Sequence, residues 1–373
     1  MSDPIPKTLL PEGLRDMLPP DAAVEAATVD SLCRSFAANG YDLVKPPLVE
    51  FEDALLSGVG APMGERIFRM LDPVSHRTLG LRADITTQIA RIAGSRLASA
   101  PRPLRLMYAG PVLRVRGSQL EPERQFTQAG FELIGAASAA ADAEAIIVTA
   151  EALTALGIGG LSVDLALPTL VAALVPNMAD DLRAALDHKD TALIKSHGGQ
   201  HAETLAALVR ASGDADAALA AVGKLKLPTA AKNEWQALVD VVAAVRKAIP
   251  ALALTIDAVE SRGFEYHTGI TFSVFVTGSQ REIGRGGRYT LPSGEPATGA
   301  TLFIDPIVAI APQPNAPKRI YVDAAVSRAD VQRLQGEGWS VVMGLDGDAP
   351  SKAEAKRLNC SHVYDGGKAV AVA

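Results

Sequence analysis

The segment RLMYAGPVLRVRGSQLEPERQFTQAGFELIG, residues 105–135, indicates the fold of this chain more clearly than any other. Two apolar stretches flank a polar turn that contains a proline, which is the pattern of two antiparallel strands. Side chains alternate between the two faces of a strand. One face of the second strand therefore carries Phe126, Gln128, Gly130 and Glu132, and the other, more apolar face carries Thr127, Ala129, Phe131 and Leu133.

The polar face of this strand has two interpretations. It either faces solvent or lines a ligand site, and periodicity alone does not separate the two. Gly130, between Gln128 and Glu132, leaves space for a small ligand to lie on the strand. Arg114 and Arg116 share a face of the preceding strand and are candidates to close the same site.

Composition sets limits on the function. The 373 residues have a net charge of -6, which argues against a protein whose main task is to hold a polyanion such as tRNA. Cys33 and Cys360 are far apart and form no Cys-x-x-Cys pair, so we expect reduced thiols and a cytoplasmic location. We expect no signal peptide in MSDPIPKTLLPEG, and no apolar stretch reaches membrane-spanning length.

Strands and helices alternate irregularly along the chain, which predicts the α+β class, with a mostly antiparallel sheet flanked by helices. Residues 168–250 are rich in Ala and Leu at helical spacing and are expected to form a helical insertion. The proline-rich APQPNAPK, residues 311–318, predicts a linker. We therefore expect one domain over residues 1–312 and a small α/β unit over residues 318–373.

Three further segments contain residue types used in binding sites. SRGFEYHTG, residues 261–269, combines residues suited to a carboxylate and an aromatic ring, but an ordinary turn explains it equally well. IGRGGRYTL lacks the Lys-Ser/Thr of a phosphate loop, so its glycines more plausibly let a strand pass close to a ligand. HGGQH spaces two histidines by four residues, but its glycines oppose a helix, so we expect no metal site.

In this order, these segments resemble the catalytic core of the histidyl-tRNA synthetases, which have the class II synthetase fold. The resemblance runs from about Pro11 to Ile310 and rests on motifs that are weak singly and specific together. They are NGYDLVKPPLVE, LRADITTQIAR, YAGPVLRVRG with RQFTQAGFELIG, SRGFEYHTGITF and GRGGRYTL.

The resemblance implies a site for L-histidine. Asp84 and Gln128 match the residues that hold the ammonium group, with Thr86 nearby, and Glu132 matches the residue that binds the imidazole. The remaining matches are Arg262 to the arginine facing the carboxylate, Tyr266 and Tyr289 to aromatic lining positions, and Arg114 to the hairpin arginine that contacts the α-phosphate. The family's imidazole-binding tyrosine is replaced by His267, whose ring ordinarily titrates near pH 6.5. If His267 faces the ligand, histidine affinity should change between about pH 6 and 8; alternatively, Tyr266 makes the contact.

The ATP half of the synthetase site is altered. Arg116 stands where the family reads adenine with a glutamate, and proline replaces phosphate-binding arginines at Pro122 and Pro306. Pro122 is also flanked by Glu121 and Glu123, which repel a triphosphate. Phosphoryl chemistry needs preorganised cations, so adenylation is not expected. The 318–373 segment is also shorter than the family's anticodon-binding domain.

A retained histidine site, an altered ATP site and a short final unit resemble the regulatory subunits of ATP phosphoribosyltransferase. This resemblance implies no catalytic residues, no cofactor and no tRNA or membrane partner. It implies a dimer within a hetero-octamer with the short-form catalytic subunit, in histidine biosynthesis, where histidine is the allosteric ligand. Two alternatives remain open: a working histidyl-tRNA synthetase, which would exchange pyrophosphate, and a free-standing histidine-sensing interaction protein.

Overall fold

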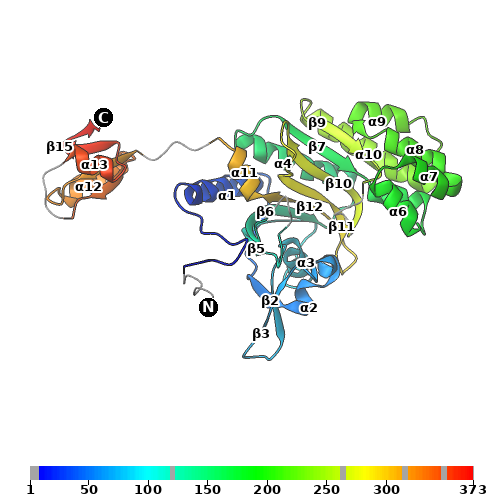
Figure 1. Ribbon diagram of the computed structural model, residues 1–373, viewed down its shortest axis with the longest axis horizontal. Coiled ribbons are helices and arrows are strands. Elements are labelled where there is room, and N and C mark those ends of the chain that lie inside the picture. Colours follow the sequence, from blue (N-terminus) through cyan, green and yellow to red (C-terminus); the bar gives the residue numbers. More distant parts are fainter. Residues whose placement is uncertain (1–7, 118–121, 261–265, 313–317, 346–350, 373) are drawn as a thin grey trace, which may run out of the picture. The chain divides into compact units, whose positions relative to one another are not determined.

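The computed structural model describes residues 8–117, 122–260, 266–312, 318–345 and 351–372. The chain divides into two compact units, Met1–Pro312 and Gln313–Ala373. The division falls at the proline-rich segment, and each unit has its own sheet (Figure 1).

The large unit contains a central sheet of nine strands within the described residues. The strands are β1 Asp42–Leu43, β5 Leu104–Leu113, β6 Gln125–Ile134, β7 Leu161–Ala166, β8 Gly213–Asp214, β9 Ala253–Asp257, β10 His267–Val276, β11 Gly284–Thr290 and β12 Pro296–Phe303. Their order is β1-β5-β6-β12-β11-β10-β7-β9-β8. Only the β1–β5 and β7–β9 pairs are parallel among these described strands, so the predicted α+β class and mostly antiparallel sheet are confirmed.

Helices cover both faces of this sheet. The helices are α1 Asp21–Ala38, α3 Thr86–Gly94, α4 Ala139–Ala155 and α11 Ile304–Ile310. Ala129 and Phe131 of β6 pack in the same core as residues of α1 and α4. Ile134 of β6 packs with residues of α3 in a separate core. The alternation of β6 therefore places its apolar face against α1 and α4, and its polar face toward α3.

The β5–β6 hairpin has the expected form, with antiparallel pairing from Leu104↔Ile134 to Leu113↔Gln125. Beside it lies a small sheet that the sequence did not reveal. Its strands and adjoining helices are β2 Val49–Phe51, β3 Phe68–Leu71, β4 Thr78–Leu81, α2 Glu52–Leu55 and η1 Gly58–Met63. β4 ends just before α3, so the connection between them, residues 82–85, lies next to β6 of the central sheet.

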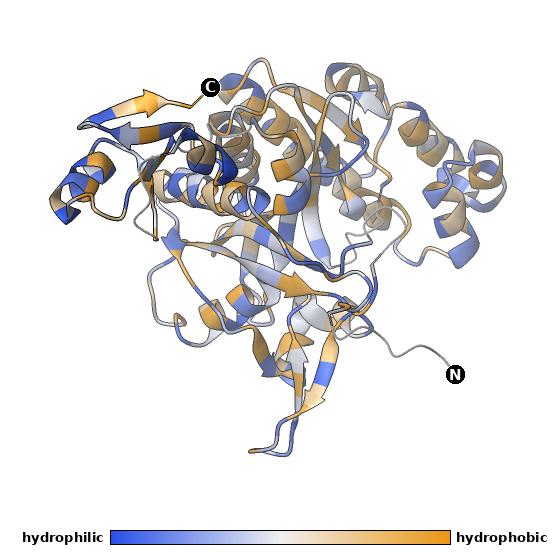
Figure 2. Ribbon diagram, turned by 60° about the vertical axis from the view of Figure 1, so that its left-hand side comes forward, coloured by the Kyte–Doolittle hydropathy of each residue, from blue (hydrophilic) through white to orange (hydrophobic). Residues whose placement is uncertain are grey.

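The expected helical insertion is present between β7 and β9. It comprises α5 Pro168–Leu174, α6 Asp180–Asp187, α7 Thr191–His197, η2 Gly199–His201, α8 Ala202–Arg210, α9 Ala215–Val222 and α10 Thr229–Ala248. Figure 2 shows hydrophobic and hydrophilic stretches alternating along these helices, and their buried leucines join the core of the large unit. The insertion also contains the unpredicted strand β8, which extends the central sheet by pairing with β9.

The small unit contains a four-stranded sheet with two helices in its described residues. Its elements are β13 Arg319–Val322, α12 Arg328–Gly336, β14 Ser340–Met343, α13 Lys352–Arg357, β15 His362–Asp365 and β16 Lys368–Ala371. β13 pairs in parallel with β14 and β15, and β16 closes the sheet antiparallel to β15. This is an α/β unit, as the sequence predicts.

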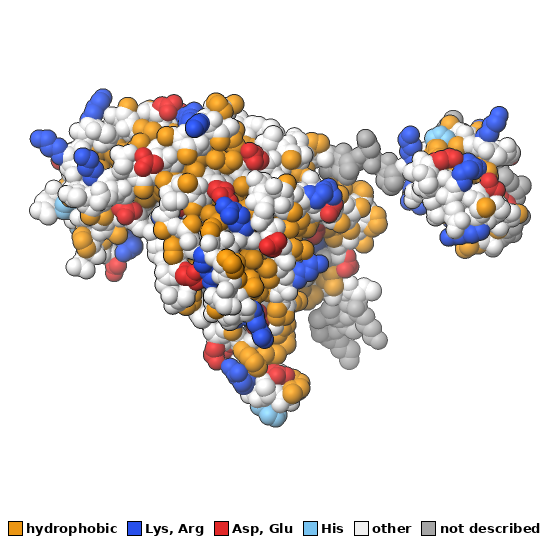
Figure 3. Space-filling model, turned by 180° about the vertical axis from the view of Figure 1, so that it is seen from behind, with side chains coloured by type: hydrophobic (Ala, Val, Ile, Leu, Met, Phe, Trp, Pro, Cys, Tyr) orange, Lys and Arg blue, Asp and Glu red, His pale blue; other side chains and the backbone are white. Residues whose placement is uncertain are grey.

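On the face of the large unit drawn in Figure 3, Lys and Arg side chains are interspersed with Asp and Glu side chains. None of the helices in the described part of the chain is both long and apolar enough to span a bilayer.

A buried ion pair attaches α4 to the central sheet. Asp142 of α4 is 2% exposed and accepts two hydrogen bonds from Arg288 of β11, at 3.0 and 2.6 Å. Thr298 of β12 donates a third, at 2.8 Å. Removing one partner of such a pair leaves a buried charge without compensation.

We predict that Asp142→Ala lowers the free energy of unfolding by about 3–5 kcal/mol, because the Arg288 guanidinium loses its counter-charge. Asp30→Ala, which removes the exposed partner of Arg34, is the control and should cost less than about 1 kcal/mol. Urea denaturation measures both. Equal losses for the two variants would contradict the assignment.

Candidate functional site

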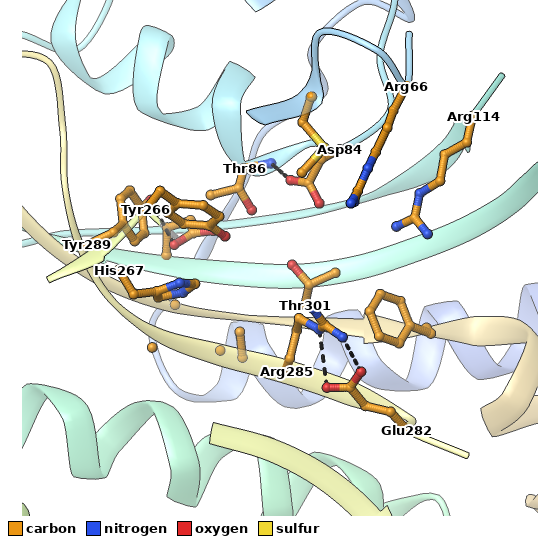
Figure 4. Close-up of a pocket in the computed structure, with 17 residues that line it drawn as sticks. Arg66, Asp84, Thr86, Arg114, Tyr266, His267, Glu282, Arg285, Tyr289 and Thr301 are labelled. Atoms are coloured by element: carbon orange, nitrogen blue, oxygen red, sulfur yellow. Dashed lines mark hydrogen bonds and ion pairs between the residues drawn. The ribbon is translucent and has the colours of Figure 1, made fainter. Parts of the chain in front are cut away.

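A cavity of about 450 Å³ opens on the α3 face of the central sheet (Figure 4). Its described lining residues come from the segments around η1, α3, β5 and β6 and from β10, β11 and β12. They are Met63, Arg66, Asp84, Thr86, Arg114, Glu132, Tyr266, His267, Glu282, Arg285, Gly286, Gly287, Tyr289, Gly299, Ala300, Thr301 and Phe303.

Strand register builds the floor of the cavity. Gly287 of β11 pairs with Gly299 of β12, which pairs with Glu132 of β6. A Cβ atom at Gly299 would lie 1.9 Å from Glu132 Oε2. A glycine is therefore required at 299 for the Glu132 side chain to lie across the sheet. Gly286 and Gly287 of GRGGRYTL also line the cavity, and the interpretation of this strand as one that passes close to a ligand stays a prediction.

Glu132 is 1% exposed, so the solvent-facing interpretation of this strand face is wrong. Tyr289 donates a 2.9 Å hydrogen bond to Glu132 Oε2. Burial raises the pKa of Glu132 to about 8, and the hydrogen bond from Tyr289 only partly opposes this effect. The carboxyl group therefore keeps its proton to a higher pH than an exposed glutamate does.

Asp84 lies opposite Glu132, in the turn that precedes α3. Its Oδ1 accepts from the backbone N–H of Thr86 at 2.8 Å, and its Oδ2 accepts from Gln128 Nε2 at 3.1 Å. Gln128 Oε1 in turn accepts from the Ile85 N–H at 3.3 Å. Gln128 is 0% exposed and is not among the residues that line the cavity. The structure thus places Gln128 behind Asp84, where it orients the carboxylate.

Tyr108 of β5 contacts two of the residues that line the cavity. Its buried hydroxyl lies 3.2 Å from Thr86 Oγ1 and 2.7 Å from Thr301 Oγ1. A Cβ atom at Gly130 would meet the Tyr108 hydroxyl at 2.5 Å. Gly130 therefore leaves room for the Tyr108 ring. The sequence had instead suggested that this space was for a ligand.

Tyr266, His267 and Tyr289 form an aromatic end of the cavity (Figure 4). The Tyr266 and His267 rings stack with their centroids 4.1 Å apart, and Tyr266 meets Tyr289 edge to face at 6.0 Å. The sequence left open whether His267 or Tyr266 contacts the imidazole of the ligand. Both residues line the cavity at this end.

The opposite end carries arginines (Figure 4). Arg114 lines the cavity as expected, whereas Arg116 is exposed and is not among the lining residues. Arg66 and Arg285 also line it and were missed by sequence reasoning. Arg66 lies in an irregular segment without a motif, and the tertiary position of Arg285 depends on strand pairing.

Two altered positions lie elsewhere, and one candidate residue is not described. Arg262, the predicted carboxylate partner, lies outside the described residues. Pro122 follows β5 in the hairpin turn, and Pro306 lies in α11, beside a small cavity that is also lined by Glu123 and Asp305. In the part of the chain that the structure describes, no group of three or more His, Cys, Asp and Glu residues is suited to hold a metal ion.

The cavity thus combines an acidic and aromatic end with an arginine end. With the antiparallel sheet and its hairpin, it defines a class II, histidyl-tRNA synthetase-like protein. A family model described as histidyl-tRNA synthetase matches residues 13–307. A crystal structure of a histidyl-tRNA synthetase from Nostoc sp. PCC 7120 shares the fold, with a TM-score of 0.77, 17% identity and coverage of 95% of this chain and 90% of the other.

More similar relatives narrow the family. The ATP phosphoribosyltransferase regulatory subunit of Paramagnetospirillum magneticum is 53% identical, covering 97% of both chains. The protein of the same name from Rhodospirillum centenum is 47% identical, covering 98% of this chain and 97% of its own. A crystal structure titled as an ATP phosphoribosyltransferase regulatory subunit/histidyl-tRNA synthetase from Bacillus halodurans has a TM-score of 0.83 at 25% identity, covering 97% of this chain and 99% of that one. The chain belongs to the family of ATP phosphoribosyltransferase regulatory subunits.

We predict that Glu132→Gln changes how stability depends on pH. A raised pKa in the folded state means that stability is greatest below the ordinary value of 4.5 and is lost as pH rises toward about 8. The amide does not titrate, so the variant should gain on the order of 4 kcal/mol relative to the parent between pH 5 and pH 8, at about 1.4 kcal/mol per unit. Urea unfolding at both pH values measures this difference, and parallel pH profiles would refute it.

Proposed function

We propose that this chain is a non-catalytic regulatory subunit of a short-form ATP phosphoribosyltransferase, which it activates for the first step of L-histidine biosynthesis. In this proposal it also mediates feedback inhibition by L-histidine. The names of its relatives, which match nearly its whole length, support the regulatory role.

One observation carries the proposal: the cavity keeps its acidic and aromatic end while its phosphate-binding positions are altered. Asp84, Glu132 and Tyr289 line one space. By contrast, proline occupies position 122 in the hairpin turn and position 306 in α11, where the resembled synthetases have arginines. A triphosphate needs fixed cations at the point where charge develops. Binding without adenylation is what this arrangement favours.

In the proposed complex, the histidine ammonium group pairs with Asp84 beside Thr86. The imidazole lies against Tyr266 and His267 and shares a proton with the Glu132 carboxyl. We assign the α-carboxylate to Arg262 and Arg114. Each charge of the zwitterion then has an opposite charge, which burial requires.

The proposed assembly is a dimer of this chain within a hetero-octamer with the catalytic subunit. Catalysis takes place on the other chain, and this chain contributes neither a cofactor nor a tRNA-binding activity. In this proposal the chain contributes the histidine cavity, and contact with the catalytic subunit transmits the occupancy of the cavity.

We predict that the parent binds L-histidine and that Asp84→Asn weakens binding by about 2–5 kcal/mol, because the ligand's ammonium group loses its counter-charge. Asp365→Asn, at an exposed position in the small unit, is the matched control and should bind like the parent. Isothermal titration calorimetry measures all three proteins. Unchanged affinity in Asp84→Asn would remove Asp84 from the site.

The proposed function itself is tested with the catalytic subunit. Mixing the two purified chains should raise the rate of phosphoribosyl-ATP formation from ATP and phosphoribosyl pyrophosphate well above that of the catalytic chain alone. L-Histidine should inhibit the mixture made with the parent, and much less the mixture made with Asp84→Asn. No rate increase on mixing, with both chains folded, would refute the activating role.

A further inference from the structure

The arginine end of the cavity contains an ion pair between neighbours on one strand edge. Glu282, just before β11, binds Arg285 of β11 through both carboxylate oxygens: Arg285 Nε donates to Oε1 at 3.1 Å, and Nη2 donates to Oε2. Figure 4 shows both side chains within the cavity, and the guanidinium group lies near Thr301. This pair plays no part in the histidine complex proposed above.

The pair is held in place by the sheet. Ser273 of β10 lies directly opposite Arg285 in the β10–β11 register. Its hydroxyl donates a 2.6 Å hydrogen bond to Glu282 Oε1, the same oxygen that accepts from Arg285 Nε. Arg285 also lies opposite Thr301 of β12. Ser273 of β10 therefore helps to fix the carboxylate on the guanidinium group, and pairing with β10 and β12 fixes the backbone of Arg285.

On the side away from the first cavity, the Glu282–Arg285 pair is surrounded by acidic residues. Glu282 and Arg285 also line a second cavity, of about 390 Å³, together with Asp164, Glu260 and Ser273. Of the charged groups that line this second cavity in the described residues, three are carboxylates and one is a guanidinium. An anion that approaches Arg285 thus meets carboxylates on that side.

The ion pair has little to contribute to stability. The side chains of Arg285 and Glu282 are 39% and 16% exposed, so solvent screens their attraction and the pair adds little to the stability of the fold. Its larger effect is on the electrostatic potential of the cavity. Arg66 and Arg114 line the same space. Removal of the Glu282 charge would make this cavity, which Asp84 also lines, more positive, and that favours bound phosphates.

We propose that Glu282 is a specificity-determining residue that excludes polyanions: its carboxylate occupies the Arg285 guanidinium group as an internal anion. A polyphosphate must displace a carboxylate that Ser273 and Arg285 hold in place. A zwitterion with no net charge is affected much less by this carboxylate. The inference concerns the arginine end of the cavity and holds whether or not the cavity binds histidine.

The test is calorimetric titration of inorganic pyrophosphate, and separately of ATP, into the full chain. We expect Glu282→Gln to bind pyrophosphate at least tenfold more tightly than the parent, and the gain to disappear at high salt. Adding Arg285→Ala to Glu282→Gln should abolish the gain. Glu354→Gln is the matched control, because Glu354 binds Arg357 with the same spacing and the same two contacts at an exposed site of the small unit.

Circular dichroism and histidine titration are run on every variant. If Glu282→Gln is misfolded, Glu282→Ala removes the same charge and carries the same expectation. A folded variant with parental pyrophosphate affinity, or an equal gain in Glu354→Gln, would overturn the proposal. Failure of every protein to bind histidine would count against the proposed function only, because the pyrophosphate comparison still decides the role of Glu282.

Discussion

The burial of one carboxyl group, that of Glu132, constrains the rest of the site. A carboxylate without solvent requires compensation, and here the main response is a raised pKa, to about 8. The surrounding strands are arranged to admit this group. Gly299 leaves room for its side chain, and Tyr289 donates to it. Two residues on neighbouring strands, a glycine of β12 and a tyrosine of β11, are thus explained by one side chain of β6.

Sequence reasoning could predict the parts of this arrangement that depend on local periodicity. The β5–β6 hairpin and the shared face of Gln128 and Glu132 follow from the pattern of side chains along a strand. The α+β class follows from the irregular order of strands and helices along the chain. Periodicity predicts which face of a strand a side chain lies on, but not whether that side chain reaches the cavity. Gln128 was expected at the ligand, yet it lies behind Asp84, because the turn before α3 places that carboxylate between the amide and the cavity.

The residues at the arginine end of the cavity could not be predicted from local periodicity. Arg285 and Glu282 are neighbours in sequence, but their position at the cavity depends on the pairing of β10, β11 and β12. Arg66 lies between η1 and β3, in a segment without periodic pattern, and the small β2–β4–β3 sheet that positions it was not predicted. Register between strands distant in sequence is a tertiary property, so the charged residues at this end of the cavity were harder to predict than the fold.

A cavity of this kind suits a regulator better than a catalyst. Catalysis requires groups that stabilise a transition state more than the bound ligand, and the altered positions Pro122 and Pro306 are the ones that would have served phosphates. Regulation requires only that the ligand favours one state of the protein over another. In the proposed role, Glu132 provides that difference, because a cationic ligand stabilises the carboxylate form that burial disfavours.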